Sequence, residues 1–184
     1  MEQTLVTLQS RLEICDMRHT GYRDGHLFVI RDKSSSDSDM AFIRIALTDQ
    51  LLDIQRRSRL LDNIVSPYLI HRAPKDRRRE WIDKKPHWTY VMPDYLTKAF
   101  AKVRDSIPRF AAMSEAERPT YHEARGLGSR IYIAQGMSES AIQALMTHAH
   151  RRTTQIYLDK GISALTDADY VPVVAPLKLS EVLK

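Results

Sequence analysis

Two short apolar segments separated by a polar tract constrain the fold of this chain most. Residues 26–31 (HLFVIR) and 41–47 (AFIRIAL) are rich in Phe, Val and Ile and partly alternate, which is typical of β-strands. The tract 33–39 (KSSSDSD) between them is polar and suits a turn. The sequence therefore predicts a β-hairpin that carries Lys33 at its tip.

Most of the remaining chain shows helical spacing of apolar residues. Leu5, Leu8, Leu12 and Cys15 recur at helical intervals with no capping residue before them, which predicts that the chain starts inside a helix of a larger unit. Further helices are expected over 49–62 with Thr48 as its cap, 93–106, 119–134, 138–148 with Ser138 as its cap, and 155–159.

Three connecting segments carry weaker expectations. Residues 67–70 are apolar enough for a further short strand, the basic segment 72–88 is expected to be irregular, and 108–118 is expected to be a linker.

In the helix over 49–62, five apolar residues are expected to form the core face: Leu51, Leu52, Ile54, Leu60 and Leu61. The predicted fold class is α+β, a mainly helical domain with a small antiparallel sheet or hairpin at one side.

The bulk properties narrow the class of protein. A chain of 184 residues fits one domain, and its single cysteine, Cys15, excludes an intramolecular disulfide and fits a reducing compartment. No apolar run approaches the ~18 residues that span a bilayer, and the first residues do not form a secretory signal. We therefore expect a cytoplasmic protein that does not bind membranes.

The basic residues are clustered, although their excess is modest. Lys and Arg number 28 against 23 Asp and Glu, a net charge of +5, which permits nucleic-acid binding without requiring it. Arg56, Arg57 and Arg59 lie close together, and the run 72–85 (RAPKDRRREWIDKK) places Trp81 among basic residues, a pattern that suits a phosphate backbone. The candidate DNA-binding residues are Arg56, Arg57, Arg59, Lys75, Arg77, Arg78, Arg79, Lys84 and Lys85. The alternative for such a run is a solvated loop.

A His and an Arg three residues apart form the first candidate for chemistry. On a helix, His122 and Arg125 would point to the same side. Phosphoryl chemistry uses such a pair, because the guanidinium neutralises non-bridging oxygens while the imidazole handles a proton. Alone, the pattern is more often an ordinary surface pair.

His148 and Tyr157 form the second candidate, nine residues apart. Each has a simpler interpretation, because a His often complements the dipole at the C-terminus of a helix and a Tyr is often a packed aromatic. His148 and His150 also suggest a metal pair, but no Cys or acidic partner stands at ligand spacing. No metal is therefore predicted.

Together, these residues resemble the catalytic domain of the tyrosine recombinases, the phage integrase family. That family has H-x-x-R, then an L-L-G-H-like turn, then a nucleophilic Tyr about nine residues later. Here the boxes read His122 and Arg125, then 145–148 (LMTH), then Tyr157. The family also places a catalytic Lys on a hairpin turn, where Lys33 is expected. The resemblance covers about residues 4–160 and is strongest over 119–159.

The first box of the family departs from its usual pattern in this chain. The family has T-G-x-R-x-x-E with a catalytic Arg, and the corresponding stretch 7–13 reads TLQSRLE. Glu13 fits the acidic position, whereas Ser10 stands where the Arg belongs and Arg11 is one residue further on, ~100° around a helix. Either a local shift lets Arg11 reach the phosphate, or the site lacks one arginine.

The resemblance implies site-specific DNA recombination through a 3′-phosphotyrosine intermediate. Tyr157 would attack the phosphodiester, His122 would accept its proton, and Lys33 would protonate the leaving 5′-oxygen. Arg125, Arg11 and His148 would hold the phosphate, with no metal or cofactor, because arginines supply the positive charge. The phenol needs this help, since its ordinary pKa of about 10 makes it a poor nucleophile at neutral pH.

The resemblance also implies partners and a division of the chain. Residues 1–160 would form the catalytic domain without its N-terminal helix and upstream DNA-binding domains, and the tail 161–184 would dock on a neighbouring subunit. The partners would be double-stranded DNA and further copies of the chain, within a bacterial cytoplasm and at the nucleoid when DNA is bound. The alternatives are a degenerate, catalytically weak or inactive DNA-binding member, and an interaction domain in which the boxes coincide by chance.

Overall fold

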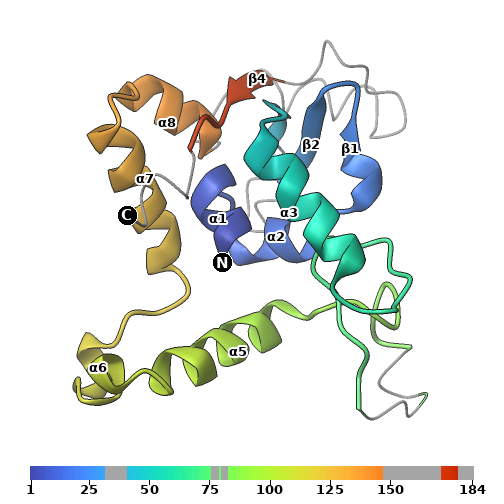
Figure 1. Ribbon diagram of the computed structural model, residues 1–184, viewed down its shortest axis with the longest axis vertical. Helices are drawn as coiled ribbons and strands as arrows, with labels where there is room; N and C mark the ends of the chain where they lie inside the picture. Colours follow the sequence, from blue (N-terminus) through green and yellow to red (C-terminus); the bar gives the residue numbers. More distant parts are fainter. Residues whose placement is uncertain (32–40, 76–78, 80–82, 147–170, 178–184) are drawn as a thin grey trace.

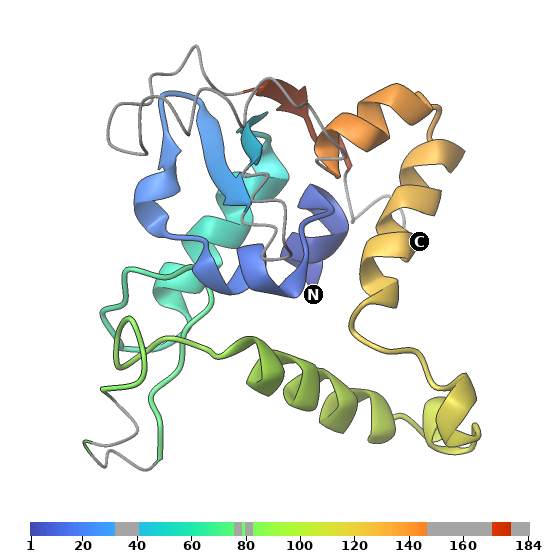
Figure 2. The same ribbon diagram turned by 180° about the vertical axis from the view of Figure 1, so that it is seen from behind.

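The computed structural model describes residues 1–31, 41–75, 79, 83–146 and 171–177. In these ranges, helices pack beside one small sheet that lies at one side of the molecule, and α5 crosses beneath the rest (Figure 1). The opposite view shows α1 lying between the sheet on one side and α7 on the other, with α2 below the sheet (Figure 2). The architecture is the predicted α+β fold, mainly helical with the sheet at one side.

The predicted hairpin is the centre of the sheet. Strands β2 (His26–Arg31) and β3 (Ala41–Ala46) pair antiparallel, and β1 (Tyr22–Arg23) extends the sheet beyond β2. The strand order is β1-β2-β3-β4. Leu27, Val29, Ile43 and Ile45 are buried, as expected for strands that pack one face against helices.

The fourth strand comes from the C-terminal tail. β4 (Val171–Val174) pairs parallel with β3, in the register Ile43 with Val171 and Ala46 with Val174. Beyond it, Ala175 and Leu177 are completely buried in the main core. This part of the tail therefore lies on the sheet of its own chain.

The chain begins with two short helices, and not with the single helix that the apolar spacing predicted. α1 (Glu2–Thr7) ends because Leu8 adopts a left-handed conformation, with φ of 54°. α2 (Arg11–Asp16) then starts at Ser10, which forms a capping box with Glu13. The expectation of a continuous helix was wrong because helical spacing of apolar residues does not detect a one-residue reversal of the backbone.

Helix α3 (Asp49–Leu60) starts as predicted, because the Thr48 hydroxyl accepts a hydrogen bond from the backbone N–H of Leu51. Its predicted core face was only partly right. Leu51 and Ile54 are buried, whereas Leu52, Leu60 and Leu61 are exposed, by up to 77% at Leu61. The apolar residues near the end of α3 therefore face solvent in this chain.

The second half of the described chain is helical. α5 (Pro93–Asp105), α7 (Glu123–Ala134) and α8 (Glu139–Leu145) match predicted helices, and the Ser138 hydroxyl caps α8 by accepting from Ala141 N. The expected linker contains the short α6 (Pro108–Ala111) and a 3₁₀ turn at Glu115–Glu117. Another 3₁₀ turn, at His19–Gly21, precedes β1. None of the described helices is long and apolar enough to cross a membrane.

The weakly predicted segments are held by isolated contacts. No strand forms over 67–70; instead Tyr68 makes a single bridge with Arg18, and His71 makes one with Tyr90. The described ends of segment 72–88 consist of turns, bends and coil, as expected. Tyr68 and Tyr90 pack edge to face beside Cys15 in a second, smaller core.

α7 lies unusually close to α1, and a glycine permits it. A Cβ atom added to Gly128 would lie 2.6 Å from Leu8 Cδ2 and 2.7 Å from the Leu5 carbonyl oxygen. In addition, the Tyr132 hydroxyl donates a 2.6 Å hydrogen bond to the Val6 carbonyl. These contacts fix the middle and the last turn of α7 against α1 and Leu8, the residue that ends α1.

Candidate active site

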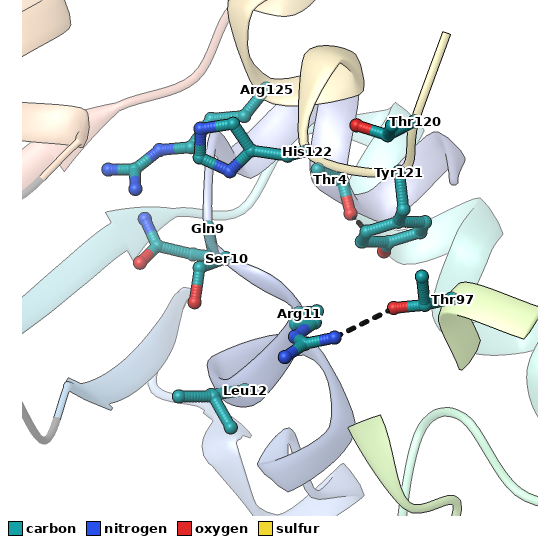
Figure 3. Close-up of a pocket in the computed structure, with 10 residues that line it drawn as sticks. All are labelled: Thr4, Gln9, Ser10, Arg11, Leu12, Thr97, Thr120, Tyr121, His122 and Arg125. Atoms are coloured by element: carbon teal, nitrogen blue, oxygen red, sulfur yellow. Dashed lines mark hydrogen bonds between the residues drawn. The ribbon is translucent and has the colours of Figure 1, made fainter. Parts of the chain in front are cut away.

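A pocket of about 360 Å³ lies where the turn between α1 and α2 faces α5 and the start of α7 (Figure 3). It brings together two pairs of residues that the sequence boxes single out, Ser10 with Arg11 and His122 with Arg125, and the pairs are more than 100 positions apart in the chain. The lining residues are Thr4, Gln9, Ser10, Arg11, Leu12, Thr97, Thr120, Tyr121, His122 and Arg125. The pocket is therefore the candidate active site.

Arg125 forms the buried cationic wall of the pocket. It lies in the first turn of α7 and is only 8% exposed. Its Nη2 donates a 2.6 Å hydrogen bond to the carbonyl oxygen of Met146, at the C-terminus of α8. This hydrogen bond and the burial of the side chain keep the guanidinium at the wall of the pocket.

His122 stands at the exposed rim of the same pocket. It occupies the cap position before α7, one turn ahead of Arg125, whose backbone N–H donates to its carbonyl. Both side chains line the pocket, as the three-residue spacing predicted. An exposed imidazole beside a buried guanidinium can exchange a proton with a ligand that the guanidinium holds.

Ser10 takes part in capping and carries no charge into the pocket. Its backbone N–H donates to Glu13 Oε2 at 2.9 Å, and its hydroxyl also bonds to that oxygen. Glu13 is 5% exposed, so its carboxylate is buried at the start of α2. The first-box position therefore contributes a short neutral side chain and a stable helix start.

Arg11 lines the pocket but is bound to α5. Its Nη1 donates to Thr97 Oγ1 at 3.0 Å and lies 3.2 Å from Asp94 Oδ1, and the stick view shows the side chain directed toward Thr97 (Figure 3). Ser10 is the cap residue of α2 and has an extended backbone, and Arg11 is the first residue of the helix. The ~100° step between successive residues of one helix therefore does not describe this pair.

The sequence boxes did not single out several polar residues of the pocket. Gln9 is completely buried, and its Nε2 donates both to Thr7 O and to Leu145 O. The Tyr121 hydroxyl lies 2.6 Å from Thr4 Oγ1, and burial raises the pKa of this phenol. The only signal for Gln9 and Tyr121 in the sequence is that each adjoins a box residue, Ser10 or His122.

The candidate DNA-binding residues lie away from the pocket lining. On α3, Asp53 binds both Arg56 and Arg57, at 2.6 and 2.7 Å, and these hydrogen bonds lower the pKa of its carboxyl. Arg57 also binds Glu2 at 2.7 Å. Arg59 donates to His19 Nδ1 at 3.5 Å. This group is thus engaged with neighbouring side chains.

The other candidates come from segment 72–88. Lys75 and Lys84 are exposed, Arg79 lies 3.9 Å from Asp83, and Lys85 donates to the Tyr90 carbonyl at 3.4 Å. The remaining predicted site residues lie outside the described residues: Lys33, Arg77, Arg78, His148 and Tyr157. Their expected roles stay predictions.

The described pocket favours an anion. It is lined by two guanidinium groups and one imidazole, and Gln9, Thr97 and Thr120 add polar groups. Within the described ranges, no three His, Cys, Asp or Glu side chains gather as metal ligands would. A phosphodiester held by Arg125 would meet hydrogen-bond donors in a partly enclosed space, where charge stabilisation is strongest.

Known proteins of similar sequence are integrases. The chain is 32% identical over 157 residues to the prophage integrase IntE of Escherichia coli K12, and 29% identical over 158 residues to the integrase of Enterobacteria phage P21. Each alignment covers 84% of this chain and 38% of the relative. The chain therefore spans about two fifths of the length of these relatives. No family profile matches it.

Solved structures share the fold. The catalytic core of lambda integrase superposes with a TM-score of 0.61 at 18% identity, over 96% of this chain and 84% of that one. The Tn1549 transposon integrase in complex with circular intermediate DNA gives a TM-score of 0.52 at 12% identity, over 85% and 52% of the two chains. The predicted fold is thus that of an integrase catalytic core.

Proposed function

The chain belongs to the phage integrases, a group of tyrosine recombinases, and we propose that it forms the strand-cleaving and rejoining core of a site-specific DNA recombinase. One observation carries this proposal: the buried Arg125 and the rim residue His122 meet in one pocket with the first-box residues. Such a pair can hold a scissile phosphate and exchange a proton with it.

The proposed reaction needs no external energy. The phenol oxygen of Tyr157 attacks the phosphorus, its proton passes to His122, and the bond from phosphorus to the 5′-oxygen breaks. Lys33 gives a proton to that leaving oxygen. The resulting 3′-phosphotyrosine conserves the bond energy, so the 5′-hydroxyl of a partner strand can reverse the reaction and rejoin the DNA.

The phosphate would be held mainly by Arg125, with His148 as a further donor. Arg11 contributes only if its side chain leaves Asp94 and Thr97. Segment 72–88 and the arginines of α3 would contact the DNA backbone and set position, not sequence. The proposal needs no metal, because the cationic side chains stabilise the charge that develops on the phosphoryl oxygens.

A second candidate function is DNA binding without strand cleavage. Ser10, where the family has a catalytic Arg, and the attachment of Arg11 to α5 favour it. Losing one donor to a developing oxyanion typically lowers a rate by about 10²–10³. The same scaffold would then bind DNA as a weak or inactive member.

Self-association is the other proposed partnership. Structures with the same fold include a lambda integrase dimer on a core site and a tetramer on a Holliday junction. We propose that copies of this chain also associate on DNA through the tail 161–184. Since β4 pairs with β3 of its own chain, docking on a neighbour would require β4 to leave that edge.

A nicked suicide substrate tests the proposal directly. The wild-type chain should form a covalent protein–DNA adduct that Tyr157→Phe does not form. Arg125→Ala should slow adduct formation by about 10² or more, whereas Arg130→Ala, an exposed arginine on the same helix, should not.

DNA binding without any adduct would establish the second candidate. Absence of both binding and adduct would contradict both functions. On its own the chain should bind duplex DNA with a Kd of about 10⁻⁴–10⁻⁶ M, the range of non-specific contacts; a nanomolar, sequence-specific Kd would refute this expectation.

A further inference from the structure

Two side chains of the candidate site hold the C-terminus of α8. Gln9 Nε2 donates to the Leu145 carbonyl at 2.7 Å, and Arg125 Nη2 donates to the Met146 carbonyl at 2.6 Å. These are consecutive carbonyls at the end of a helix, where no backbone N–H of the same helix remains to bind them. Side chains from two other elements thus complete the last turn of α8.

The Gln9 side chain has little freedom to do anything else. It is completely buried. Its Nε2 donates two hydrogen bonds to backbone carbonyls, at 2.8 Å to Thr7 O and at 2.7 Å to Leu145 O. Its Oε1 is buried with no partner among the described residues. Burying an amide oxygen in this way costs free energy, which the two donated bonds must offset.

The turn that carries Gln9 is itself held rigidly. The left-handed Leu8 turns the chain inward after α1, and its N–H donates to Thr4 O at 2.9 Å. The close approach of Gly128 to Leu5 and Leu8 locks this turn against α7. Gln9 therefore connects a fixed turn to the end of α8.

We infer that Gln9 is a positioning residue for the proposed cleavage site, an inference that rests on the proposed function. The carbonyl that it binds belongs to Leu145, three positions before His148 and in the same L-M-T-H box. By fixing the last turn of α8, Gln9 fixes the point at Met146 beyond which the sequence continues to His148 and Tyr157. Both of its donated hydrogen bonds go to backbone carbonyls, so Gln9 would act through α8.

Gln9 and Arg125 both hold the end of α8, but only Arg125 carries a charge. Arg125 holds Met146 with one guanidinium nitrogen, and its charge is also needed for the phosphate. Gln9 is neutral and holds α8 whether or not a phosphate is bound. The hydrogen bond from Gln9 to α8 therefore uses no group that the phosphate requires.

The test compares two buried glutamines, Gln9 and Gln3. Gln9→Met keeps the length of the side chain and removes both donors. Gln3→Met is the matched control, because Gln3 is 3% exposed on α1 and its Nε2 bonds to Met17 Sδ, away from α8. In full-length protein, hydrogen exchange of the Leu145 and Met146 amides should become faster in Gln9→Met only.

Cleavage gives the second readout. With saturating suicide substrate, the single-turnover rate of adduct formation should fall about tenfold in Gln9→Met, which corresponds to one ordinary hydrogen bond. The Kd for DNA should stay unchanged, and Gln3→Met should cleave at the wild-type rate. A loss caused by general destabilisation would affect both variants.

The outcomes separate this inference from the proposed function. Unchanged exchange at Leu145 and Met146 in Gln9→Met would overturn the inference. Faster exchange with an unchanged cleavage rate would also overturn it, since the contact would then serve stability alone. If the wild-type chain forms no adduct, the proposed function fails, and the inferred role fails with it even where exchange shows that Gln9 holds α8.

Discussion

Arg11 and Asp94 form an ion pair between the start of α2 and the first turn of α5, with Nη1 3.2 Å from Oδ1. The side chains are 44% and 82% exposed, so water screens the pair and it adds ~1 kcal/mol or less to stability. Its importance lies in where it keeps Arg11. The arginine next to Ser10 donates to α5 and would have to leave Asp94 and Thr97 to bind a phosphate in the pocket.

Asp94→Asn should release Arg11 toward bound DNA. We expect tighter binding of duplex DNA and a salt dependence that is steeper by about 0.9 in log Kd against log salt, the increment for one added phosphate contact. Fluorescence anisotropy at several salt concentrations measures both. Asp49→Asn removes the same charge from the first turn of α3 and is the control. An equal effect in both variants would show that only net charge matters.

Ser10→Arg should accelerate strand cleavage. If the pocket lacks one cationic donor, restoring a guanidinium at this position should raise the rate of adduct formation by about 10²–10³. Loss of the Ser10 hydroxyl from the capping box should cost ~1 kcal/mol of folding stability, which thermal unfolding would report.

Ser10→Gln is the matched control, because it adds a long side chain without charge. An equal gain with Gln, or no gain with Arg in a variant that still binds DNA, would show that the missing arginine does not limit the reaction.

The sequence predicted much of this fold because its signals are local. The alternation over 26–31 and 41–47 identified β2 and β3, and the hydroxyl residues Thr48 and Ser138 identified the starts of α3 and α8. The break after α1 was missed, because Leu8 in a left-handed conformation has no signal in apolar spacing. The parallel pairing of β4 with β3 was also missed, since it joins segments more than 120 positions apart.

The candidate site was predicted in part for a similar reason. His122 and Arg125 meet in the pocket because residues three positions apart at the start of a helix lie on the same side of it. The partners of Arg11 and Gln9 lie on α5 and α8, and no local pattern relates these elements to α2. The residue types identified the sequence boxes of the family. Which of their side chains bond to other parts of the protein depends on how distant helices pack, and the sequence pattern does not show this.

Gly128→Ala should destabilise the fold by ~1–3 kcal/mol, because the added methyl group would overlap the Leu5 backbone and the Leu8 side chain. Gly126→Ala is the control on the same helix, since its Cβ would meet nothing closer than Arg130 Nη1 at 3.7 Å. That variant should gain ~0.5–1 kcal/mol from helix propensity. Chemical denaturation of both proteins would check the opposite signs, and a destabilised Gly126→Ala would contradict the explanation.

The stability of the protein should depend on the protonation of His19. Burial, followed by the nearby Arg59 and His71, lowers the pKa of this imidazole from its ordinary 6.5. Because the folded state binds the proton less well than the unfolded state, the stabilising contribution is full above pH 6.5. It is lost as the pH falls through 6.5 toward the lower folded pKa.

Denaturation measured between pH 5 and 7.5 should therefore show a smaller decline toward low pH in His19→Gln than in the wild type. Arg59→Gln should show an intermediate decline, because it removes the second cause of the pKa shift and leaves burial, the largest cause, in place. Identical slopes in wild type and His19→Gln would mean that His19 does not couple folding to pH in this range.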